Sequence, residues 1–296
     1  MKETILITGA RGALANVVKN KLKNKYTIRL LTTSKKIVNN KTIFYWNIDK
    51  NYIDCNALQN CDHIIHLAGY PIINRWTKKN KNLMFTSRIN SSELIFKSCK
   101  ENNIKPKTFI SASAIGYYGL SSKGMKNEND KKGEDWVADL VDSWEKSANN
   151  FTSIGFRVIN MRISLLISKE IAFLKYNILS VKFGIGLITG SKNRNFSWIH
   201  VEDVAKFIQN SIEKNIYSGV YNLATENNIT ELEFINILRK KYCSLSLVIK
   251  VPNSLLKLLL GERRKIINAN YTVNVNKLKE INFKWTYEKF DNVLNK

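Results

Sequence analysis

An α/β fold, with a doubly wound parallel sheet and a small mixed C-terminal domain, is predicted by three features of the sequence. Apolar strand-like segments alternate with amphipathic helical segments through most of the chain. A glycine-rich turn separates the first strand from the first helix, and 44% of the 296 residues are hydrophobic. Because alternating strands and helices must cross over the sheet at each step, they favour parallel strands with helices on both faces.

The expected elements follow one another in a regular order. Short apolar runs predict strands at residues 4–8, 27–32, 42–46, 62–67, 107–112, 157–163 and 220–223. Apolar residues at helical spacing predict helices near 13–24, 79–103, 134–150 and 201–214. Together these elements predict a first domain over residues 1–225, in which 164–196 is irregular and contributes to the substrate side. Short helical runs at 230–241 and 253–261 predict a small second domain over 226–296.

The turn after the first strand carries the most specific local signal. Gly9, Gly12 and Ala15 follow one another at G-x-x-G-x-x-A spacing. Small residues let the backbone turn tightly and approach a pyrophosphate, and the free N–H groups of a helix N-terminus favour its negative charge. The turn therefore predicts a dinucleotide-binding domain of the Rossmann type, the alternative being glycines that only shape a loop. The residues expected to contact the dinucleotide here are Thr8, Gly9, Arg11, Gly12, Ala13 and Leu14.

Composition and charge limit the classes of partner. A formal net charge of +23 would suit nucleic acid or another anionic surface. However, the lysines are spread along the chain among many Asn and Ile residues, as AT-rich codons would produce, and the basic clusters lack interleaved aromatic residues. Nucleic acid is therefore not expected as a partner. No apolar run approaches the ~20 residues that cross a membrane. We expect a cytoplasmic protein that binds a small-molecule substrate and has no membrane partner.

The N-terminus and the cysteines agree with that location. Met1-Lys2-Glu3 leads directly into the first strand, so no signal peptide is expected. The four cysteines show neither Cys-x-x-Cys spacing nor a nearby histidine cluster. They are interpreted as reduced thiols, and no metal site is expected.

Further motifs follow the glycine-rich turn in order. They are the segments 61–69 (CDHIIHLAG), 109–119 (FISASAIGYYG), 196–204 (FSWIHVEDV) and 219–224 (GVYNLA). This ordered set resembles the extended short-chain dehydrogenase/reductase superfamily, in its NAD-dependent epimerase/dehydratase branch. Segments 71–77, 87–90 and 252–262, Trp144-Glu145 and the Lys277 to Phe283 pattern narrow the resemblance. They are similar to atypical epimerase-family proteins that carry a C-terminal domain of unknown function, often labelled nucleoside-diphosphate-sugar epimerases and sometimes cell-division inhibitors.

The end of the second strand predicts which dinucleotide is bound. No acidic residue stands there, although NAD sites commonly place Asp or Glu at this point to hold the ribose 2′-OH. Thr32, Thr33 and Ser34 supply hydroxyl groups, and Lys35 and Arg11 supply positive charge, which suit a 2′-phosphate. We therefore expect NADP(H) in preference to NAD(H), the alternative being a solvated loop. The resemblance places an Arg where Thr33 stands, which implies a weaker phosphate clamp.

The resemblance implies further cofactor contacts along the carboxyl edge of the sheet. They are Asn47, Ile48, His66, Leu67, Ala68, Gly69, Arg88, Ser111 and Ala112. Asn47 stands where the family has Asp, and its amide oxygen can still accept from an amine on adenine. His66 is expected to pack at the end of its strand, the alternative being an acid/base role, and the alternative for Arg88 is an exposed charge on a helix.

The expected catalytic pair is missing. Members of the superfamily use a Tyr and a Lys four residues later, whose charge lowers the pKa of the Tyr. None of the twelve tyrosines has Lys at that spacing, and the helix at 134–145 shows a core stripe of Val and Trp instead. Ser113 matches the serine that orients the substrate oxygen, and Tyr117 is the candidate substitute acid. Tyr118 matches a structural Tyr-Gly, so packing is an alternative for this pair.

Two arginines are expected on the substrate side, and two functions remain open. Arg162 ends the sixth strand and Arg194 precedes the Ser-Trp-Ile-His segment, so each is a candidate for a substrate phosphate or carboxylate. His200 and Asp203 suit the start of a helix. The first hypothesis is an NADP(H)-dependent oxidoreductase or epimerase of a nucleotide sugar or similar polar molecule. The alternative is a non-catalytic nucleotide-binding regulator of cell division or redox sensing.

Overall fold

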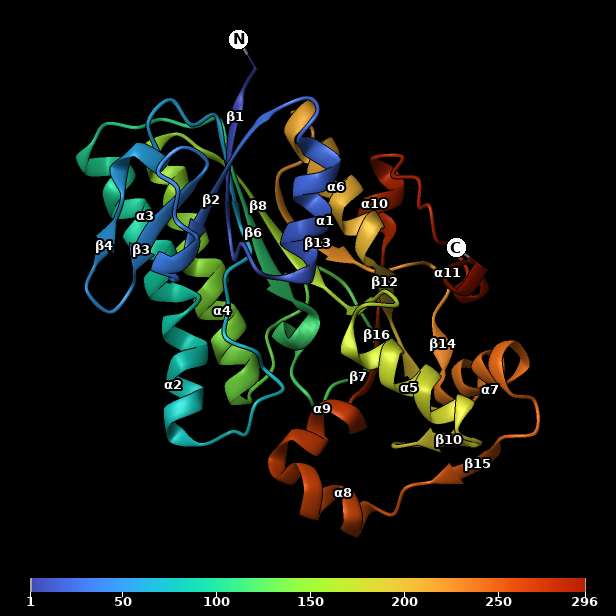
Figure 1. The fold of residues 1–296 in the computed structure, drawn as a ribbon. Coiled ribbons are helices and arrows are strands. Elements are labelled where there is room, and N and C mark those ends of the chain that lie inside the picture. The colour runs from blue at the N-terminus through green and yellow to red at the C-terminus, as the bar shows by residue number, and fades with distance from the viewer. Residues whose placement is uncertain (1, 296) are drawn as a thin grey trace. The chain divides into compact units, whose positions relative to one another are not determined.

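A mostly parallel sheet dominates the computed structural model, which describes residues 2–295. Within these residues eight strands form the sheet in the order β13-β8-β6-β5-β1-β2-β3-β4 (Figure 1). They are β1 (Thr4–Thr8), β2 (Thr27–Thr32), β3 (Ile43–Asn47), β4 (Tyr52–Ile53), β5 (His63–His66), β6 (Thr108–Ala114), β8 (Arg157–Ile163) and β13 (Gly219–Leu223). The seven predicted strands are therefore confirmed, and β4 is an additional short strand that runs antiparallel to β3.

The strand order reverses at β1. Both β2 and β5 pair with β1 in parallel, although β5 follows β4 in the chain. In open sheets of this kind, ligands bind outside the carboxyl ends of the strands where the order reverses. The ends of β1 and β5 are therefore the place to look for a site.

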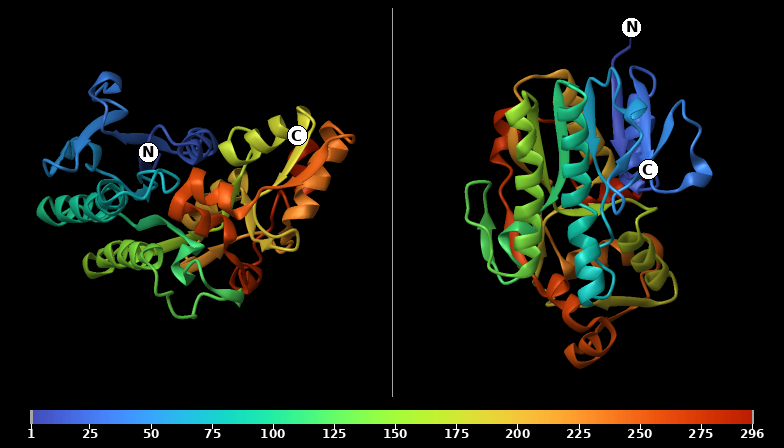
Figure 2. Two further views of the ribbon diagram at one scale, coloured as in Figure 1. Left: turned by 90° about the horizontal axis from the view of Figure 1, so that it is seen from below. Right: turned by 90° about the vertical axis from the view of Figure 1, so that its left-hand side faces the viewer.

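Helices cover both faces of this sheet. They are α1 (Ala13–Leu22), α2 (Lys78–Thr86), α3 (Ile89–Glu101), α4 (Trp136–Asn149) and α6 (Val201–Glu213). Figure 1 shows α1 and α6 on one face, and the right panel of Figure 2 shows α3 and α4 side by side over the other. The short 3₁₀ helices are η1 (Lys35–Ile37), η2 (Cys55–Ala57), η3 (Ile115–Tyr118), η4 (Asn150–Ile154) and η5 (Gly261–Arg263). The doubly wound arrangement expected from the sequence is therefore present.

The single helix predicted over 79–103 is in fact two helices. The break falls at Ser87 and Arg88, where side chains bind carbonyl groups of the preceding turn. The Arg88 guanidinium donates to the Met84 carbonyl at 3.0 Å, and the Ser91 hydroxyl donates to the Ser87 carbonyl at 2.7 Å. Side-chain donors of this kind compete with backbone hydrogen bonds, and sequence periodicity does not reveal them.

The core lies on both sides of the central strands. All five residues of β1 are buried, and Ile64 and Ile65 of β5 are fully buried. On one face the rings of Phe109 and Phe151 stack with centroids 3.7 Å apart. Burying one such apolar side chain contributes about 1.5–3 kcal/mol. A strand covered on both faces needs a continuous apolar run rather than an alternating one, as residues 5–7 have.

The chain divides into two compact units, each built from three separate stretches. The first contains residues 2–114, 139–162 and 204–221, and the second contains 115–138, 163–203 and 222–295. The boundary predicted after residue 225 differs from this division. Strand β7 (Lys123–Lys126) pairs with β16 (Asn270–Val273), which ties an early segment to the C-terminal part of the chain. Such pairing between distant segments leaves no signal in local composition.

The second unit is built from paired short strands and helices. Strands β9 (Leu165–Ile167) and β12 (Trp198–His200) pair, as do β10 (Ile185–Ile188) with β15 (Leu247–Lys250) and β11 (Asn195–Phe196) with β14 (Ile229–Thr230). Its helices are α5 (Ala172–Lys182), α7 (Glu231–Tyr242), α8 (Asn253–Leu260), α9 (Arg264–Asn268), α10 (Asn276–Glu280) and α11 (Phe290–Asn295). The helical runs predicted at 230–241 and 253–261 are confirmed as α7 and α8.

The prediction that residues 164–196 are irregular is wrong. This segment contains β9, α5, β10 and β11. Its glycines suggested a loop, but two of them serve regular structure. Gly184 adopts a φ of 86° just after α5, and Gly186 lies within β10, where a Cβ would come within 2.6 Å of the Ile235 side chain on α7. Close packing of α7 on β10 therefore requires a glycine inside the strand.

Candidate functional site

The glycine-rich turn lies against the end of β5. Gly9 has a φ of 74°, and a Cβ there would lie 2.9 Å from the Leu67 carbonyl oxygen. Glycine is needed on both counts, since other residues avoid positive φ and no side-chain atom fits the gap. The Gly12 N–H donates to the Gly9 carbonyl at 2.8 Å, which closes the turn. Gly12 also begins α1 without a side-chain cap, and the first turn of α1 has no acidic residue, so its N–H groups remain suited to an anion.

The hydroxyl of Thr8 holds the two strand ends together. It accepts hydrogen bonds from the backbone N–H groups of Leu67 and Ala68, both at 3.0 Å, and lies 3.0 Å from Nδ1 of His66. Thr8 is fully buried, so water does not compete for these bonds. The backbone of residues 67–69 is therefore fixed beside the glycine-rich turn.

His66 is part of a buried hydrogen-bond chain. Because the Thr8 hydroxyl already accepts two hydrogen bonds, we assign its proton to Nδ1 of His66, which places the imidazole proton on Nε2. Nε2 lies 3.1 Å from the Ser91 hydroxyl, which itself donates to the Ser87 carbonyl. Burial lowers the pKa of His66 to about 4, so the ring is neutral at physiological pH. His66 is fully buried, as expected for a packing residue, and it orients the backbone that follows it.

The Arg88 guanidinium packs against the backbone of Gly69. A Cβ on Gly69 would be 3.0 Å from the guanidinium carbon, and that carbon lies 4.9 Å from the ring centroid of Trp144. One guanidinium nitrogen donates to the carbonyls of Tyr70 and Met84 at 2.9 and 3.0 Å. Burial lowers the pKa of Arg88 to about 10, which leaves it charged. Among residues 2–295 no carboxylate pairs with it, so this is not the exposed helix charge considered as an alternative.

The residues after β2 divide into internal and exposed groups. Thr32 is buried, and its hydroxyl accepts from the Ser34 N–H at 3.1 Å, so it shapes the loop. Thr33 and Lys35 are exposed, and Lys35 Nζ lies 5.3 Å from the Tyr45 ring centroid. A hollow of about 490 Å³ at this edge is lined by Lys35, Val38, Tyr45 and Tyr52. The exposed charge and hydroxyls required for a 2′-phosphate are thus available on this loop.

Asn47 and Ile48 end β3 beside this hollow. The Asn47 amide oxygen accepts from the Lys50 N–H at 3.0 Å, and its amide nitrogen donates to the Tyr45 hydroxyl at 3.2 Å. Ile48 packs against the apolar core of the sheet. An amide oxygen has two lone pairs, so Asn47 can still accept from an adenine amine.

The end of β6 carries a buried triad. The Ser113 hydroxyl donates to one oxygen of Glu145 at 2.6 Å, and Arg162 binds both oxygens of the same carboxylate at 2.8 Å. All three residues are at most 5% exposed. Arg162 was expected to offer its guanidinium to a substrate phosphate, and the structure instead directs it to Glu145. A buried carboxylate needs a paired and hydrogen-bonded cation, which explains why Arg162 binds Glu145.

Glu145 is a site residue that the sequence interpretation missed. It lies on α4 four residues after Val141, so it shares a face with the buried stripe of that helix. An acidic residue on an apolar helical face is the signal that could have identified it, because such a charge must find a buried partner. Ser91 was missed for the same reason: it looks like an ordinary helix residue until His66 is placed beside it.

Ser111 and Ala112 lie next to His66 on the adjacent strand. In the register of β5 and β6, His66 faces Ser111. The Ser111 hydroxyl is fully buried and donates to the Ala112 carbonyl at 2.9 Å. Its hydrogen is therefore used within β6, which leaves Ser113 as the serine near the strand end whose hydroxyl pairs with a carboxylate.

Tyr117 and Arg194 belong to the second unit. Tyr117 is half-buried, with its ring centroid 5.6 Å from that of Tyr118. Tyr118 is almost fully buried and donates to the Asn222 amide oxygen at 2.7 Å, as its packing alternative expected. Arg194 forms an ion pair with the buried Glu231 at 3.2 Å. Arg194, which was predicted to bind the substrate, therefore already has an internal counter-charge in Glu231.

His200 ends β12 just before α6, and Asp203 lies in the first turn of that helix, which agrees with the helix start expected there. The His200 ring lies over that of Tyr287 with centroids 3.7 Å apart, and its Nδ1 accepts from the Glu202 N–H. The fully buried Asp203 carboxylate accepts from the backbone N–H groups of Thr286 and Tyr287. These contacts give both residues a structural role within the second unit.

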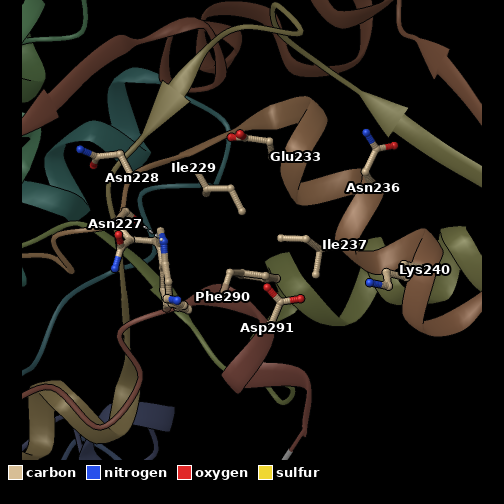
Figure 3. A pocket seen from close by; sticks show the side chains of 11 residues that line it. Asn227, Asn228, Ile229, Glu233, Asn236, Ile237, Lys240, Phe290 and Asp291 are labelled. Atoms are coloured by element: carbon tan, nitrogen blue, oxygen red, sulfur yellow. Dashed lines mark hydrogen bonds between the residues drawn. The ribbon is translucent and has the colours of Figure 1, made fainter.

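Another hollow lies in the second unit, apart from the predicted site residues. It measures about 510 Å³, and Figure 3 shows Ile229, Ile237 and Phe290 at its apolar part. Asn227 and Asn236 are among its polar residues. Residues 2–295 contain no cluster of His, Cys, Asp or Glu side chains that could hold a metal ion. No helix of this part of the chain is long and apolar enough to cross a bilayer.

Comparisons with known proteins agree with this geometry. The sequence profile described as the NAD dependent epimerase/dehydratase family matches residues 5–224. Epimerase family protein SH2119 of Staphylococcus haemolyticus is 31% identical over 288 residues, which cover 95% of this chain and 94% of that protein. Epimerase family protein SAR0825 of Staphylococcus aureus is 30% identical over the same shares of the two chains.

Solved structures show the same fold. The human epimerase family protein SDR39U1, crystallised with NADPH, superposes with a TM-score of 0.82 at 19% identity, covering 98% of this chain and 97% of that one. UDP-N-acetylglucosamine 4-epimerase from Methanobrevibacter ruminantium superposes with a TM-score of 0.79 at 20% identity, covering 99% and 96%. At these identities the likeness establishes the fold alone.

Replacing Gly9 by alanine should destabilise the protein more than the same change at Gly155. Both glycines have positive φ, but a Cβ at Gly155 meets no atom within 4 Å, whereas at Gly9 it meets the Leu67 carbonyl. The backbone strain is shared, so the excess cost at Gly9, about 1 kcal/mol or more, comes from the close contact. Urea unfolding of the two variants measures the difference. Equal losses would contradict the requirement for close approach.

Acidification should weaken the fold through His66. An unfolded histidine gains its proton near its ordinary pKa of 6.5, but folded His66 gains it only near 4. The unfolded state therefore binds more protons between these values, so this contribution to stability is complete above about pH 6.5 and decreases toward pH 4, by up to about 3 kcal/mol. The chain has three histidines, so NMR titration of their rings resolves His66 directly.

The variant His66→Gln provides the control for this titration. Glutamine has no group that titrates in this range, so the variant should lose part of the decline in unfolding free energy between pH 6.5 and 4. A His66 resonance that titrates near pH 6.5 in the folded protein would show that the buried chain is wrongly assigned.

Proposed function

The chain belongs to the NAD-dependent epimerase/dehydratase family, and from this premise we propose that it binds NADP(H) and acts as an oxidoreductase or epimerase. Its substrate is a nucleotide sugar or a similar small polar molecule. The crystal structures of related folds include sugar-nucleotide epimerases, which supports this substrate class.

Arg88 is the observation that carries the cofactor proposal. Its charge is partly buried and has no carboxylate partner among residues 2–295, which is costly unless a ligand supplies the counter-charge. It lies behind Gly69, where a Cβ would already collide with the guanidinium. The glycine-rich turn nearby is compact, since a Cβ at Gly9 would lie 2.9 Å from the Leu67 carbonyl oxygen and one at Gly12 would lie 3.2 Å from the Gly9 carbonyl oxygen. We infer that the pyrophosphate binds across this turn and neutralises Arg88.

The preference for NADP(H) rests on the loop after β2. Thr33, Ser34 and Lys35 carry no negative charge, and the first and last are exposed. A 2′-phosphate gains from hydroxyl donors and a cation, whereas a free 2′-OH gains from a carboxylate that this loop lacks. The NADPH crystallised with human SDR39U1 supports the proposal.

Ser113 is proposed to orient the substrate. NADP(H), when bound, supplies a hydride donor or acceptor at its nicotinamide ring. Because the Ser113 proton is directed to Glu145, the serine oxygen is left to accept a hydrogen bond from a substrate hydroxyl. Arg162 binds both oxygens of the Glu145 carboxylate and fixes its position, so the direction of this bond is set before the substrate arrives. Tyr117 is the candidate acid.

The alternative function, a non-catalytic nucleotide-binding regulator, is favoured by one observation. Val137 and Val141 are buried on α4, whose sequence was expected to hold the Tyr-Lys pair of the superfamily. Without that pair, a bound cofactor could be sensed rather than used.

Calorimetric titration with NADPH and NADH tests the cofactor preference. We expect NADPH to bind at least about tenfold more tightly, which corresponds to about 1.4 kcal/mol. The variant Lys35→Gln should reduce this preference, and Lys41→Gln, which removes an exposed charge elsewhere, should not. Arg88→Gln should weaken both cofactors alike, because both contain the pyrophosphate. Equal affinity of the unaltered protein for the two cofactors would contradict the preference.

Turnover by the Ser113→Ala variant separates the enzyme from the regulator. With NADPH and a panel of UDP-sugars and carbonyl compounds, the variant should lose about 100-fold or more in rate while binding NADPH normally. Ser147→Ala is the matched control, because this buried serine is outside the predicted site and its hydroxyl donates to the Trp144 carbonyl on α4. If the unaltered protein binds NADPH but turns over nothing in the panel, the regulator is the better account.

A further inference from the structure

Helix α8 presents leucines to solvent on one face. Leu255, Leu258 and Leu259 recur at i, i+3 and i+4 and are 43%, 81% and 61% exposed. Leu256 is the buried residue of this helix, so α8 already packs through that side chain. The outward leucines are therefore additional to what the fold of this helix requires.

The preceding strand also exposes apolar side chains. On β15, Leu247 and Ile249 are 68% and 44% exposed, while Val248 between them packs against the core of the second unit. Leu245, just before the strand, is 90% exposed. Figure 1 shows that β15 leads into α8 after a short connection. We call Leu245, Leu247, Ile249, Leu255, Leu258 and Leu259 the apolar face.

The segment that carries the apolar face is strongly basic. Residues 239–265 contain eight Lys or Arg residues and one acidic residue, Glu262. Lys250 and Lys257 are exposed on or beside the same strand and helix as these leucines, and Arg264 and Lys265 follow α8 after the short helix η5. Positive charge around protruding leucines is the composition of a segment that lies in the interface of an anionic bilayer.

We propose that the apolar face docks onto the surface of an anionic lipid bilayer. Its leucines enter the boundary between headgroups and acyl chains, and the lysines and arginines contact the lipid phosphates. A second copy of the chain fits less well, because it would bring two basic segments together in a protein of net charge +23. Side chains as exposed as Leu245 and Leu258 protrude, and a fluid bilayer accommodates protruding groups without a matching groove.

The proposal revises the expectation of no membrane partner. That expectation rested on the absence of an apolar run long enough to span a bilayer, which does not bear on a segment lying in the interface. The proposal does not depend on the cofactor or the reaction, so it can succeed or fail independently of the proposed function.

Vesicle flotation tests the proposal with the full-length protein. We expect the protein to float with vesicles of phosphatidylcholine and phosphatidylglycerol at a 4:1 ratio, to stay behind with pure phosphatidylcholine vesicles, and to be released in part by salt. The double variant Leu258→Glu, Leu259→Glu should reduce the bound fraction at least about tenfold, since it removes apolar insertion and adds charge repulsion. Ile216→Glu is the matched control, because Ile216 is 59% exposed outside the apolar face.

A second pair of variants tests the charged part. Arg264→Gln with Lys265→Gln should weaken binding to the anionic vesicles, and Lys78→Gln with Lys79→Gln should weaken it less for the same loss of charge. Circular dichroism confirms that each variant is folded. No flotation of the unaltered protein, or equal losses in the variant and control pairs, would overturn the proposal. So would a concentration-dependent dimer, detected by light scattering, that the leucine variants dissolve without any vesicle binding.

Discussion

The contact between the end of β1 and the end of β5 is the constraint on which the candidate site depends. Gly9 comes so close to Leu67 and Ala68 that no Cβ fits between them. The buried Thr8 hydroxyl holds the two segments at this distance, because it accepts hydrogen bonds from the N–H groups of Leu67 and Ala68. His66 completes the arrangement, because its Nδ1 accepts a hydrogen bond from the Thr8 hydroxyl. Because each of these hydrogen-bonding groups has a partner, the backbone that would face a pyrophosphate has a fixed conformation before any ligand binds. A preformed site of this kind lowers the entropic cost of binding.

The distribution of counter-charges distinguishes structural from functional arginines. Arg162 and Arg194 each face a buried carboxylate, and both pairs hold segments of the fold together. Arg88 is also partly buried but has only carbonyl and aromatic neighbours among the described residues. Arg29 and Arg157 also lack a carboxylate partner among the described residues and donate to carbonyl groups. The feature particular to Arg88 is its contact with Gly69, next to the residues that meet the glycine-rich turn, and this position supports the proposed cofactor site.

Much of the fold could be predicted from the periodicity of apolar residues and from the glycines that mark turns. The seven strands and the long helices depend on local patterns of apolar residues, which the chain displays clearly. The glycine-rich turn and the absence of an acid after β2 were equally visible. The second unit was harder, since β10 holds a glycine inside a strand and β7 pairs with a segment about 150 residues away. The pairing of Arg162 with Glu145 was not visible either, because a sequence shows which residues are charged but not which of them meet.

By itself, the sequence determined the alternation of strands and helices, the small residues of the first turn and the lack of a Tyr-Lys pair. Each is a property of neighbouring residues, and short-range sterics and hydrogen bonding are enough to interpret it. Tertiary structure alone decided that Arg162 meets Glu145 and that Leu258 points to solvent while Leu256 is buried. Helical spacing specifies which side chains share a face, but only packing against other elements specifies which face is covered.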